Sequence, residues 1–115
     1  MLIISDVIRG YTDTIILSKL NRGDSYGYEI NKFIQQTTNN EYELKEATLY
    51  TAFRRLEAMG AIVSYWGDEN TGARRRYYTI TDEGRKLYEE NVSDWKKIKN
   101  MLRVLLEEEN YECKD

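Results

Sequence analysis

The sequence predicts a mainly helical α+β domain, in which a small β-hairpin stands between a group of three helices and one long final helix. Three observations lead to this prediction. Apolar residues recur at spacings of three and four along four segments, two short strand-like runs flank a polar segment that contains glycine, and no proline interrupts any helix in the 115 residues. A chain of this length forms one domain, or one domain with an appended helix.

The first two helices are predicted on either side of a turn. Residues 3–20 carry apolar side chains on one helical face, and residues 21–24 (Asn-Arg-Gly-Asp) favour a turn. Asp24 or Ser25 is expected to cap the second helix, which runs to about Thr38. The predicted inner face of this helix comprises Tyr28, Ile30, Phe33 and Ile34.

The third helix is predicted from about Lys45 to Met59, and Gly60 after it is a typical helix stop. Its apolar stripe comprises Leu49, Ala52, Phe53, Leu56 and Met59. Residues 61–66 and 75–80 have the composition of strands, and residues 67–73 between them are polar and contain two glycines. These two strands and their loop therefore predict a hairpin.

The final helix is predicted to begin after Thr81, a residue that caps helices well, and to run to about Glu109. Two sets of its residues recur every seven positions, as in helices that pack against another helix. These residues, here called the heptad face, are Tyr88, Asn91, Trp95, Ile98, Leu102 and Leu105. Residues 110–115 follow as an acidic tail.

Three helices and a hairpin in this order are the parts of a winged helix-turn-helix, which we assign to residues 1–80 as a DNA-binding domain, although other small α+β domains share the order. Residues 81–109 form a helix too long for the three-helix core to cover, since about 25 residues span ~38 Å. A partner chain must therefore bury its heptad face. We expect a homodimer, in which the first helix packs on the partner's last helix.

The residue counts exclude several function classes. The chain has no histidine, which removes histidine-dependent nucleophiles, most zinc sites and the commonest general base. We therefore expect no enzyme, no metal and no cofactor. The single cysteine, Cys113, excludes a disulfide within the chain. No apolar run approaches the length of a membrane span and no signal peptide is apparent, so a cytoplasmic protein without a membrane partner is expected.

Net charge alone argues against a nucleic-acid partner, because the chain carries −3 at pH 7. The charge is unevenly placed, however. Residues 45–76 hold six basic and four acidic residues, while the segments before and after are both net negative. The only net-positive segment thus covers the third helix and the hairpin, the two elements that contact DNA in a winged helix.

The third helix presents a polar face that can enter a major groove. Its candidate DNA-contacting residues are Lys45, Thr48, Tyr50, Thr51, Arg54 and Arg55. An ordinary solvated helix face remains the alternative.

In the hairpin, Arg74, Arg75 and Arg76 stand together without an acid between them. Consecutive strand residues point to opposite faces, so the three cannot all serve one contact. Arg74 at the loop edge is the best phosphate or minor-groove candidate, Arg75 is a further candidate, and Gly72 permits close approach of the backbone. The alternative is an edge hairpin kept soluble by charge.

A family resemblance rests on spaced matches along this region. They are Glu-Ala-Thr-Leu-Tyr at 46–50, Arg-Leu-Glu at 55–57, Gly60, Tyr-Trp-Gly-Asp-Glu at 65–69, Arg-Arg-Arg-Tyr-Tyr at 74–78, and Thr81 with Gly84. With them, the chain resembles the PadR family of bacterial transcriptional regulators from about Ile8 to Arg103. Thr51 departs from the family pattern, which usually has proline there. Within the family, the likeness is greatest to a multidrug-binding branch, of lactococcal type, that also lacks this proline.

The resemblance implies a homodimeric winged-helix repressor whose C-terminal helix dimerises, in a bacterial cell and associated with the nucleoid. Two-fold symmetry would place two recognition helices on a palindromic double-stranded operator, with half-sites about one turn apart. By spacing alone, Trp95 is either dimer core or a stacking platform for a planar aromatic molecule.

The resemblance favours the stacking platform, in a pore at the dimer interface. It implies that the ligand-binding residues are Tyr11, Thr14, Tyr88, Asn91, Trp95 and Lys99. Lys99 stands where multidrug-binding members have an acid, so we expect a neutral or anionic ligand.

The leading hypothesis is therefore a ligand-responsive repressor. The alternatives are a winged helix that binds protein rather than DNA, and a repressor of this family that responds to phenolic acids rather than drugs.

Overall fold

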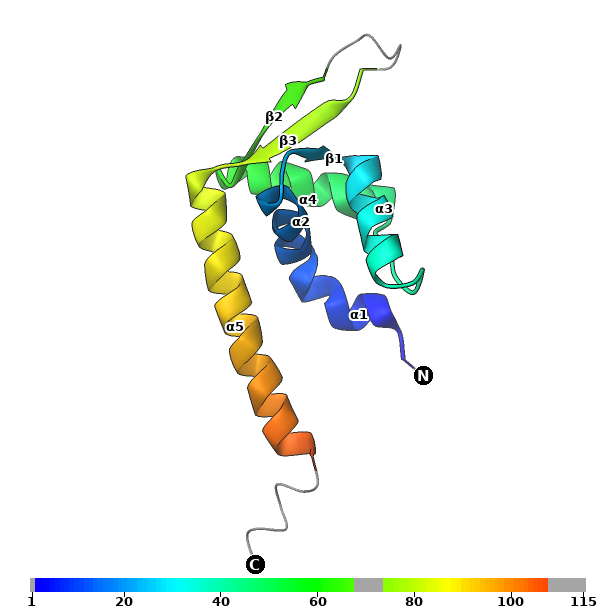
Figure 1. Ribbon diagram of the computed structural model, residues 1–115, viewed down its shortest axis with the longest axis vertical. Coiled ribbons are helices and arrows are strands. Elements are labelled where there is room, and N and C mark those ends of the chain that lie inside the picture. The colour runs from blue at the N-terminus through cyan, green and yellow to red at the C-terminus, as the bar shows by residue number, and fades with distance from the viewer. Residues whose placement is uncertain (1, 68–73, 108–115) are drawn as a thin grey trace, which may run out of the picture.

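The computed structural model describes residues 2–67 and 74–107, and it has the predicted fold class (Figure 1). Its elements, in chain order, are α1 (Ile4–Ile8), η1 (Arg9–Tyr11), α2 (Thr12–Asn21), β1 (Ser25–Tyr26), α3 (Gly27–Thr37), α4 (Glu46–Ala58), β2 (Ile62–Trp66), β3 (Arg76–Ile80) and α5 (Asp82–Leu106). The predicted third helix, both hairpin strands and the long final helix are confirmed, with ends shifted by one to three residues. The predicted loop at 67–73 lies outside the described residues except for Gly67, and the acidic tail at 110–115 lies wholly outside them.

The sheet has three antiparallel strands in the order β1-β3-β2, so β3 is central. Tyr78 of β3 pairs with Ser25 on one side and Ser64 on the other. The third strand, β1, was not predicted because it is only two residues long, too short for any alternation of apolar and polar side chains. Ser25, expected to be a helix cap, is instead a fully buried strand residue whose hydroxyl donates to Glu29 Oε1 at 2.5 Å.

The hydrophobic core lies between the sheet and helices α2, α3 and α4. Phe53 of α4 stacks on Tyr78 with ring centroids 3.9 Å apart and planes at 17°. Ile16, Leu17 and Leu20 of α2 close the core from the other side, and all are at most 1% exposed. Burial raises the pKa of the Tyr78 phenol, because the charged form would lose its hydration.

Several predictions at the N-terminal half were wrong. The helix expected over residues 3–20 is broken, because a 3₁₀ turn at Arg9–Tyr11 separates α1 from α2. Gly10 lies in that turn and weakens helix propensity there. The Thr12 hydroxyl also donates to the Arg9 carbonyl oxygen at 3.0 Å. Helix α3 has no side-chain cap, because β1 occupies the positions where the cap was expected.

Two residues assigned to inner faces are exposed. Tyr28 is 70% exposed at the start of α3, and Met59 is 53% exposed just after α4. Each lies at a helix end, where the periodic stripe passes beyond the core that it packs against. The remaining residues predicted for the two stripes are buried or half-buried, with Ile30, Leu49, Ala52, Phe53 and Leu56 at most 3% exposed.

The junction between β3 and α5 is closely packed. Thr81 caps α5 as predicted, since its hydroxyl oxygen accepts from the Gly84 amide at 3.0 Å and its hydroxyl donates to the Gly60 carbonyl at 2.6 Å. Gly84 is buried against Ala61 and Ile80, so closely that a Cβ there would overlap the Ala61 carbonyl oxygen and lie 2.7 Å from Ile80 Cγ1. Glycine is therefore required for α5 to approach the sheet.

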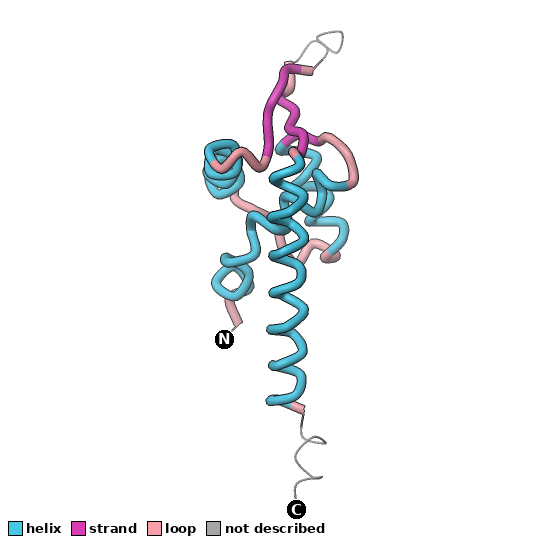
Figure 2. The backbone as a smooth tube through the Cα atoms, turned by 90° about the vertical axis from the view of Figure 1, so that its left-hand side faces the viewer, coloured by secondary structure: helices cyan, strands magenta, loops and turns pink. Residues whose placement is uncertain are grey.

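Helix α5 extends away from the sheet, past the other helices, while the hairpin projects from the opposite end (Figure 2). Along its outer half, the apolar side chains are exposed in the single chain, among them Trp95 at 40% and Leu105 at 57%. The outer half begins where α5 passes beyond α2, the helix against which its first half packs. Apolar side chains of α1 (Val7) and just before it (Leu2 and Ile3) are exposed as well.

Replacing Gly84 with alanine should destabilise the protein, by about 1–3 kcal/mol, because the added methyl group must displace backbone and not only a flexible side chain. Thermal unfolding followed by circular dichroism measures this effect. Gly10→Ala is the matched control, since a Cβ at Gly10 meets nothing within 4 Å and should leave the melting temperature unchanged or slightly higher. Equal melting temperatures for the two variants would contradict the packing described here.

Candidate nucleic-acid interface

The exposed side of α4 carries most of the side chains predicted to contact DNA. Lys45, Thr48, Tyr50, Thr51 and Arg54 are all exposed. The opposite side of the helix is the buried stripe that packs on the sheet and on α2 and α3. The structure thus brings these five predicted residues together on one helix, with their side chains in solvent.

The start of α4 is fixed by an amide side chain of α3. Asn31 Nδ2 donates to the Leu44 carbonyl oxygen at 2.7 Å, and the Leu44 amide donates to Asn31 Oδ1 at 2.8 Å. Leu44 itself is buried, only 3% exposed. This pair of bonds ties the segment before Lys45 to α3, and it holds the first turn of α4 in a set position relative to the core.

Tyr50 is held in place by its neighbours, although its side chain is partly exposed. Its ring packs edge-on against Phe53, with centroids 5.5 Å apart. Its hydroxyl oxygen lies over Gly27, where a Cβ would come within 2.9 Å of it. Glycine at the start of α3 therefore leaves room for this phenol. On the next turn, Arg54 Nη2 donates to the Thr51 hydroxyl oxygen at 3.3 Å.

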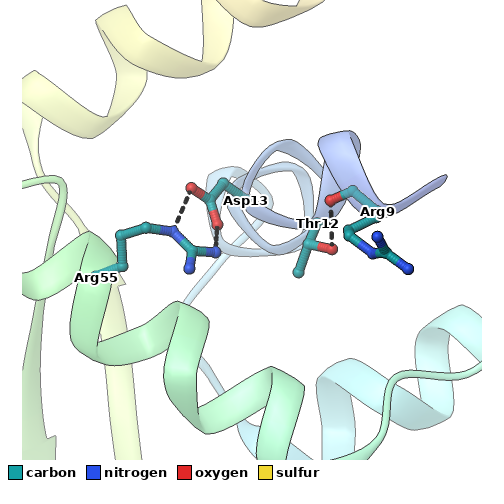
Figure 3. A network of polar contacts seen from close by, with 4 residues as sticks. All are labelled: Arg9, Thr12, Asp13 and Arg55. Carbon is teal, nitrogen blue, oxygen red and sulfur yellow. Dashed lines mark hydrogen bonds and ion pairs between the residues drawn. The ribbon is translucent and has the colours of Figure 1, made fainter. Parts of the chain in front are cut away.

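Arg55, the remaining α4 residue of the predicted set, points elsewhere. Its guanidinium donates twice to the carboxylate of Asp13 in α2, from Nε at 3.0 Å and from Nη2 at 2.5 Å (Figure 3). This bonding raises the pKa of the Arg55 guanidinium. Arg55 is thus paired with an acid that the sequence analysis did not assign to it, and its contact with DNA stays a prediction. Sequence reasoning missed Asp13 because 42 positions separate it from Arg55.

The hairpin arginines lie against aromatic rings. The guanidinium carbons of Arg74 and Arg76 are 4.9 and 6.0 Å from the Trp66 ring centroid, and that of Arg75 is 4.9 Å from the Tyr26 centroid. Cations are attracted to aromatic faces at these distances. The arginines of the predicted DNA contact therefore have preferred orientations, and their aromatic partners were not predicted. Gly72, also predicted to approach DNA, lies outside the described residues.

Polar contacts attach the loop-proximal part of the hairpin to the segment before β1. The Tyr65 hydroxyl donates to Asp24 Oδ2 at 2.6 Å, and the Tyr65 ring stacks on Tyr77 at 5.7 Å. Hydrogen bonds from Thr79 and Tyr65 lower the pKa of the Asp24 carboxyl, and the bond to Asp24 raises the pKa of the Tyr65 phenol. Asp24, expected to be a helix cap, thus anchors the hairpin.

A second link joins the hairpin to α4. Glu57 accepts from the Ser64 hydroxyl at 3.1 Å, and Arg76 Nη2 lies 3.6 Å from Glu57 Oε2. Glu57 in the last turn of α4 is therefore connected to both strands of the hairpin. This connection places the two candidate DNA-contacting elements in one unit.

The predicted ligand-binding residues lie on two segments that approach each other. Tyr11 and Thr14 belong to η1 and α2, and the others belong to α5, which packs along α2. Tyr11, Thr14, Tyr88 and Asn91 are half-buried, whereas Trp95 and Lys99 are exposed. Lys99 Nζ lies 5.0 Å from the Trp95 ring centroid, over one of its faces. A cation therefore borders the indole.

The described part of the chain shows neither a metal-binding cluster nor a membrane-spanning helix. In residues 2–67 and 74–107, no three histidine, cysteine, aspartate or glutamate side chains stand close enough to hold a metal ion together. None of the described helices has the length and apolar character needed to cross a membrane.

Comparison with known proteins identifies the family. The model of the transcriptional regulator PadR-like family matches residues 16–90. A transcriptional regulator of Clostridium thermocellum has a solved structure that is 52% identical, with a TM-score of 0.84 over 92% of this chain and 100% of that one. A PadR family transcription regulator of Clostridium difficile is 40% identical, with a TM-score of 0.74 over 84% and 99%.

More distant matches come from Bacillus subtilis. Its negative transcriptional regulator PadR is 25% identical over 80 residues, which are 70% of this chain and 42% of that protein. The solved structure of Bacillus subtilis PadR in complex with operator DNA shares the fold, with a TM-score of 0.62 and 22% identity over 70% of this chain and 45% of that one. The family-model match and the two clostridial structures establish that this chain belongs to the PadR-like family of transcriptional regulators.

Proposed function

We propose that the protein is a transcriptional repressor that binds a palindromic DNA operator as a homodimer. The observation that carries the proposal is that α4, with its exposed polar face, is joined to the hairpin that bears the arginines, through contacts of Glu57 with Ser64 and Arg76. The similarity in fold to Bacillus subtilis PadR, whose structure contains operator DNA, supports it. In this arrangement, α4 enters the major groove and Arg74 and Arg75 meet phosphates beside it.

The apolar surface of α5 supports the homodimer. Trp95, Ile98, Leu102 and Leu105 of the heptad face are between 40% and 57% exposed in the single chain. Exposed apolar surface of this extent is typical of an interface. The exposed apolar side chains at the N-terminus, Leu2, Ile3 and Val7, are available to cover the partner's α5. Residues 1–80 then serve as the DNA-binding domain and residues 81–109 as the dimerisation helix.

We further propose that a planar aromatic molecule regulates the repressor by stacking on Trp95 in a pore between the two chains. Half-buried Tyr11, Thr14, Tyr88 and Asn91 would line the pore. Lys99 beside the indole favours a neutral or anionic ligand, a class that includes phenolic acids as well as uncharged drugs. Such a ligand changes operator affinity only if it binds the DNA-bound and the free dimer differently.

Arg74→Ala should weaken operator binding and reduce its salt dependence. Loss of one phosphate contact lowers the slope of log affinity against log salt by about one. Electrophoretic mobility shift of the duplex upstream of the protein's own gene, at several salt concentrations, measures the slope. Arg85→Ala is the matched control, because Arg85 is an exposed arginine on α5 paired with Asp82. If the protein bound only protein partners, it would show no salt-dependent preference for this duplex.

Leu102→Asp should dissociate the dimer, because it places a charge in the centre of the proposed apolar interface. Sedimentation velocity should then find a monomer where the wild-type chain is a dimer. Asn100→Asp adds the same charge on the same turn of α5, outside the heptad face, and should leave the dimer intact. A dimeric Leu102→Asp variant would show that α5 does not form the interface.

A neutral planar dye should quench Trp95 fluorescence when it stacks on the indole, with a dissociation constant in the micromolar range or below. Trp66 is the second tryptophan, so the Trp95→Ala variant isolates its contribution and should lose the quenching. Lys99→Glu should increase the affinity for a cationic dye relative to a neutral one, because it reverses the charge beside the ring. Equal quenching in Trp95→Ala would refute the proposed site.

A further inference from the structure

The ion pair between Asp13 and Arg55 joins α4, the recognition helix of the proposed function, to α2, which begins beside the proposed pore. Asp13 lies in the first turn of α2 and Arg55 near the end of α4, and two parallel bonds connect them (Figure 3). Of the ion pairs described for residues 2–67 and 74–107, it alone is closed by two hydrogen bonds between different helices. Bidentate pairing of this kind fixes orientation as well as distance.

Asp13 is itself held in place. It lies in the first turn of α2, where a carboxylate is favoured by the helix dipole. The preceding residue, Thr12, is only 5% exposed, and its hydroxyl donates to the Arg9 carbonyl oxygen in the 3₁₀ turn. The Asp13 side chain is 24% exposed, compared with 48% for Arg55. The acid is thus the fixed partner of the pair, and the arginine reaches to it from α4.

Other polar contacts hold α4 at its start, through Asn31 and Leu44, and in its last turn, through Glu57 and Ser64. The pair with Asp13 adds a directional restraint on rotation from the side of α2.

The buried stripe of α4, centred on Phe53, prevents the helix from leaving the core. Apolar packing is not directional, so it opposes small rotations about the helix axis less strongly than paired hydrogen bonds do. A rotation at Arg55 moves Thr48 and Thr51 as well, because the helix turns as a unit and Thr48 lies only about 10 Å along the axis.

We infer that Asp13 is a positioning residue for operator recognition, which acts through Arg55 to hold α4 at the rotation that presents Thr48 and Thr51 to base edges. The inference rests on the proposed DNA-binding function. Neither member of the pair needs to touch DNA in this role. Arg55 serves specificity through Asp13, and not as a phosphate-binding cation.

Simple electrostatics and this inference predict opposite effects of removing the acid. Asp13→Asn deletes one negative charge and releases a cation on the recognition helix, so charge alone predicts tighter binding to any DNA. If Asp13 positions α4, the Asp13→Asn variant should bind the operator more weakly and bind unrelated DNA equally well or more tightly. The ratio of the two affinities therefore separates the two effects.

The experiment measures binding of full-length wild-type, Asp13→Asn, Arg55→Gln and double-variant protein to the duplex upstream of its own gene and to a scrambled duplex of equal length. Each single variant should reduce the operator preference by about fivefold, the size expected for one partly exposed, well-formed ion pair. The double variant should lose no more operator preference than either single variant, because both substitutions break the same contact. Asp82→Asn is the matched control, since Asp82 is 94% exposed and pairs only locally with Arg85.

A direct DNA contact by Arg55 gives a different pattern and would overturn the inference. Arg55→Gln would then weaken binding to both duplexes and lower the salt slope by about one, while Asp13→Asn would strengthen both. An unchanged operator preference in Asp13→Asn would overturn it as well. Melting temperatures identify any variant that merely unfolds, and a charge-swapped Asp13→Arg/Arg55→Asp protein should recover part of the preference. If the wild-type chain has no operator preference, the proposed function fails, and this inference fails with it.

Discussion

The stack of Phe53 on Tyr78 is the contact on which the rest of the structure depends. It joins the middle of α4 to the middle of the central strand, with ring centroids 3.9 Å apart and almost parallel planes. Strand β3 in turn forms hydrogen bonds with both other strands and leads directly into α5. One buried aromatic pair therefore connects α4, the hairpin and the long helix. Large aromatic side chains suit this role because each buries much apolar surface in a defined orientation.

Residues with a local or periodic signal were predictable from the sequence, and those defined by distant partners were not. The apolar period of α4, the strand composition of the hairpin and the Thr81 cap all depend on residues within a few positions, and the structure has each of them. Strand β1 exists only because β3 pairs with it, so its two residues carry no signal of their own. The same holds for Asp13 and Arg55, which meet across the core. The break near Gly10 was not predicted, because the apolar period continues on both sides of it.

The aromatic residues of the sheet orient the basic side chains of the hairpin. Residues 45–76 are net positive in a chain of net charge −3, so the basic surface is small. Within it, Arg74 and Arg76 lie over Trp66, and Arg75 lies over Tyr26. Arginines held against rings lose less conformational freedom on binding than free ones do. In the proposed repressor, the acidic remainder would oppose loose binding to any DNA, whereas the oriented arginines would retain their contacts at a matching site. The combination favours selectivity over general affinity.

The junction at Gly84 determines how a signal could pass from the proposed pore to the DNA-binding surface. Helix α5 meets the end of β3 without a Cβ between them, because a Cβ at Gly84 would overlap the Ala61 carbonyl oxygen and lie 2.7 Å from Ile80 Cγ1, so the two elements are closely packed. A ligand that separates two α5 helices in the proposed dimer must therefore move each DNA-binding domain as a rigid body. With no histidine in the chain, protonation of an imidazole near neutral pH cannot produce this motion. The control proposed above acts instead through packing around Trp95.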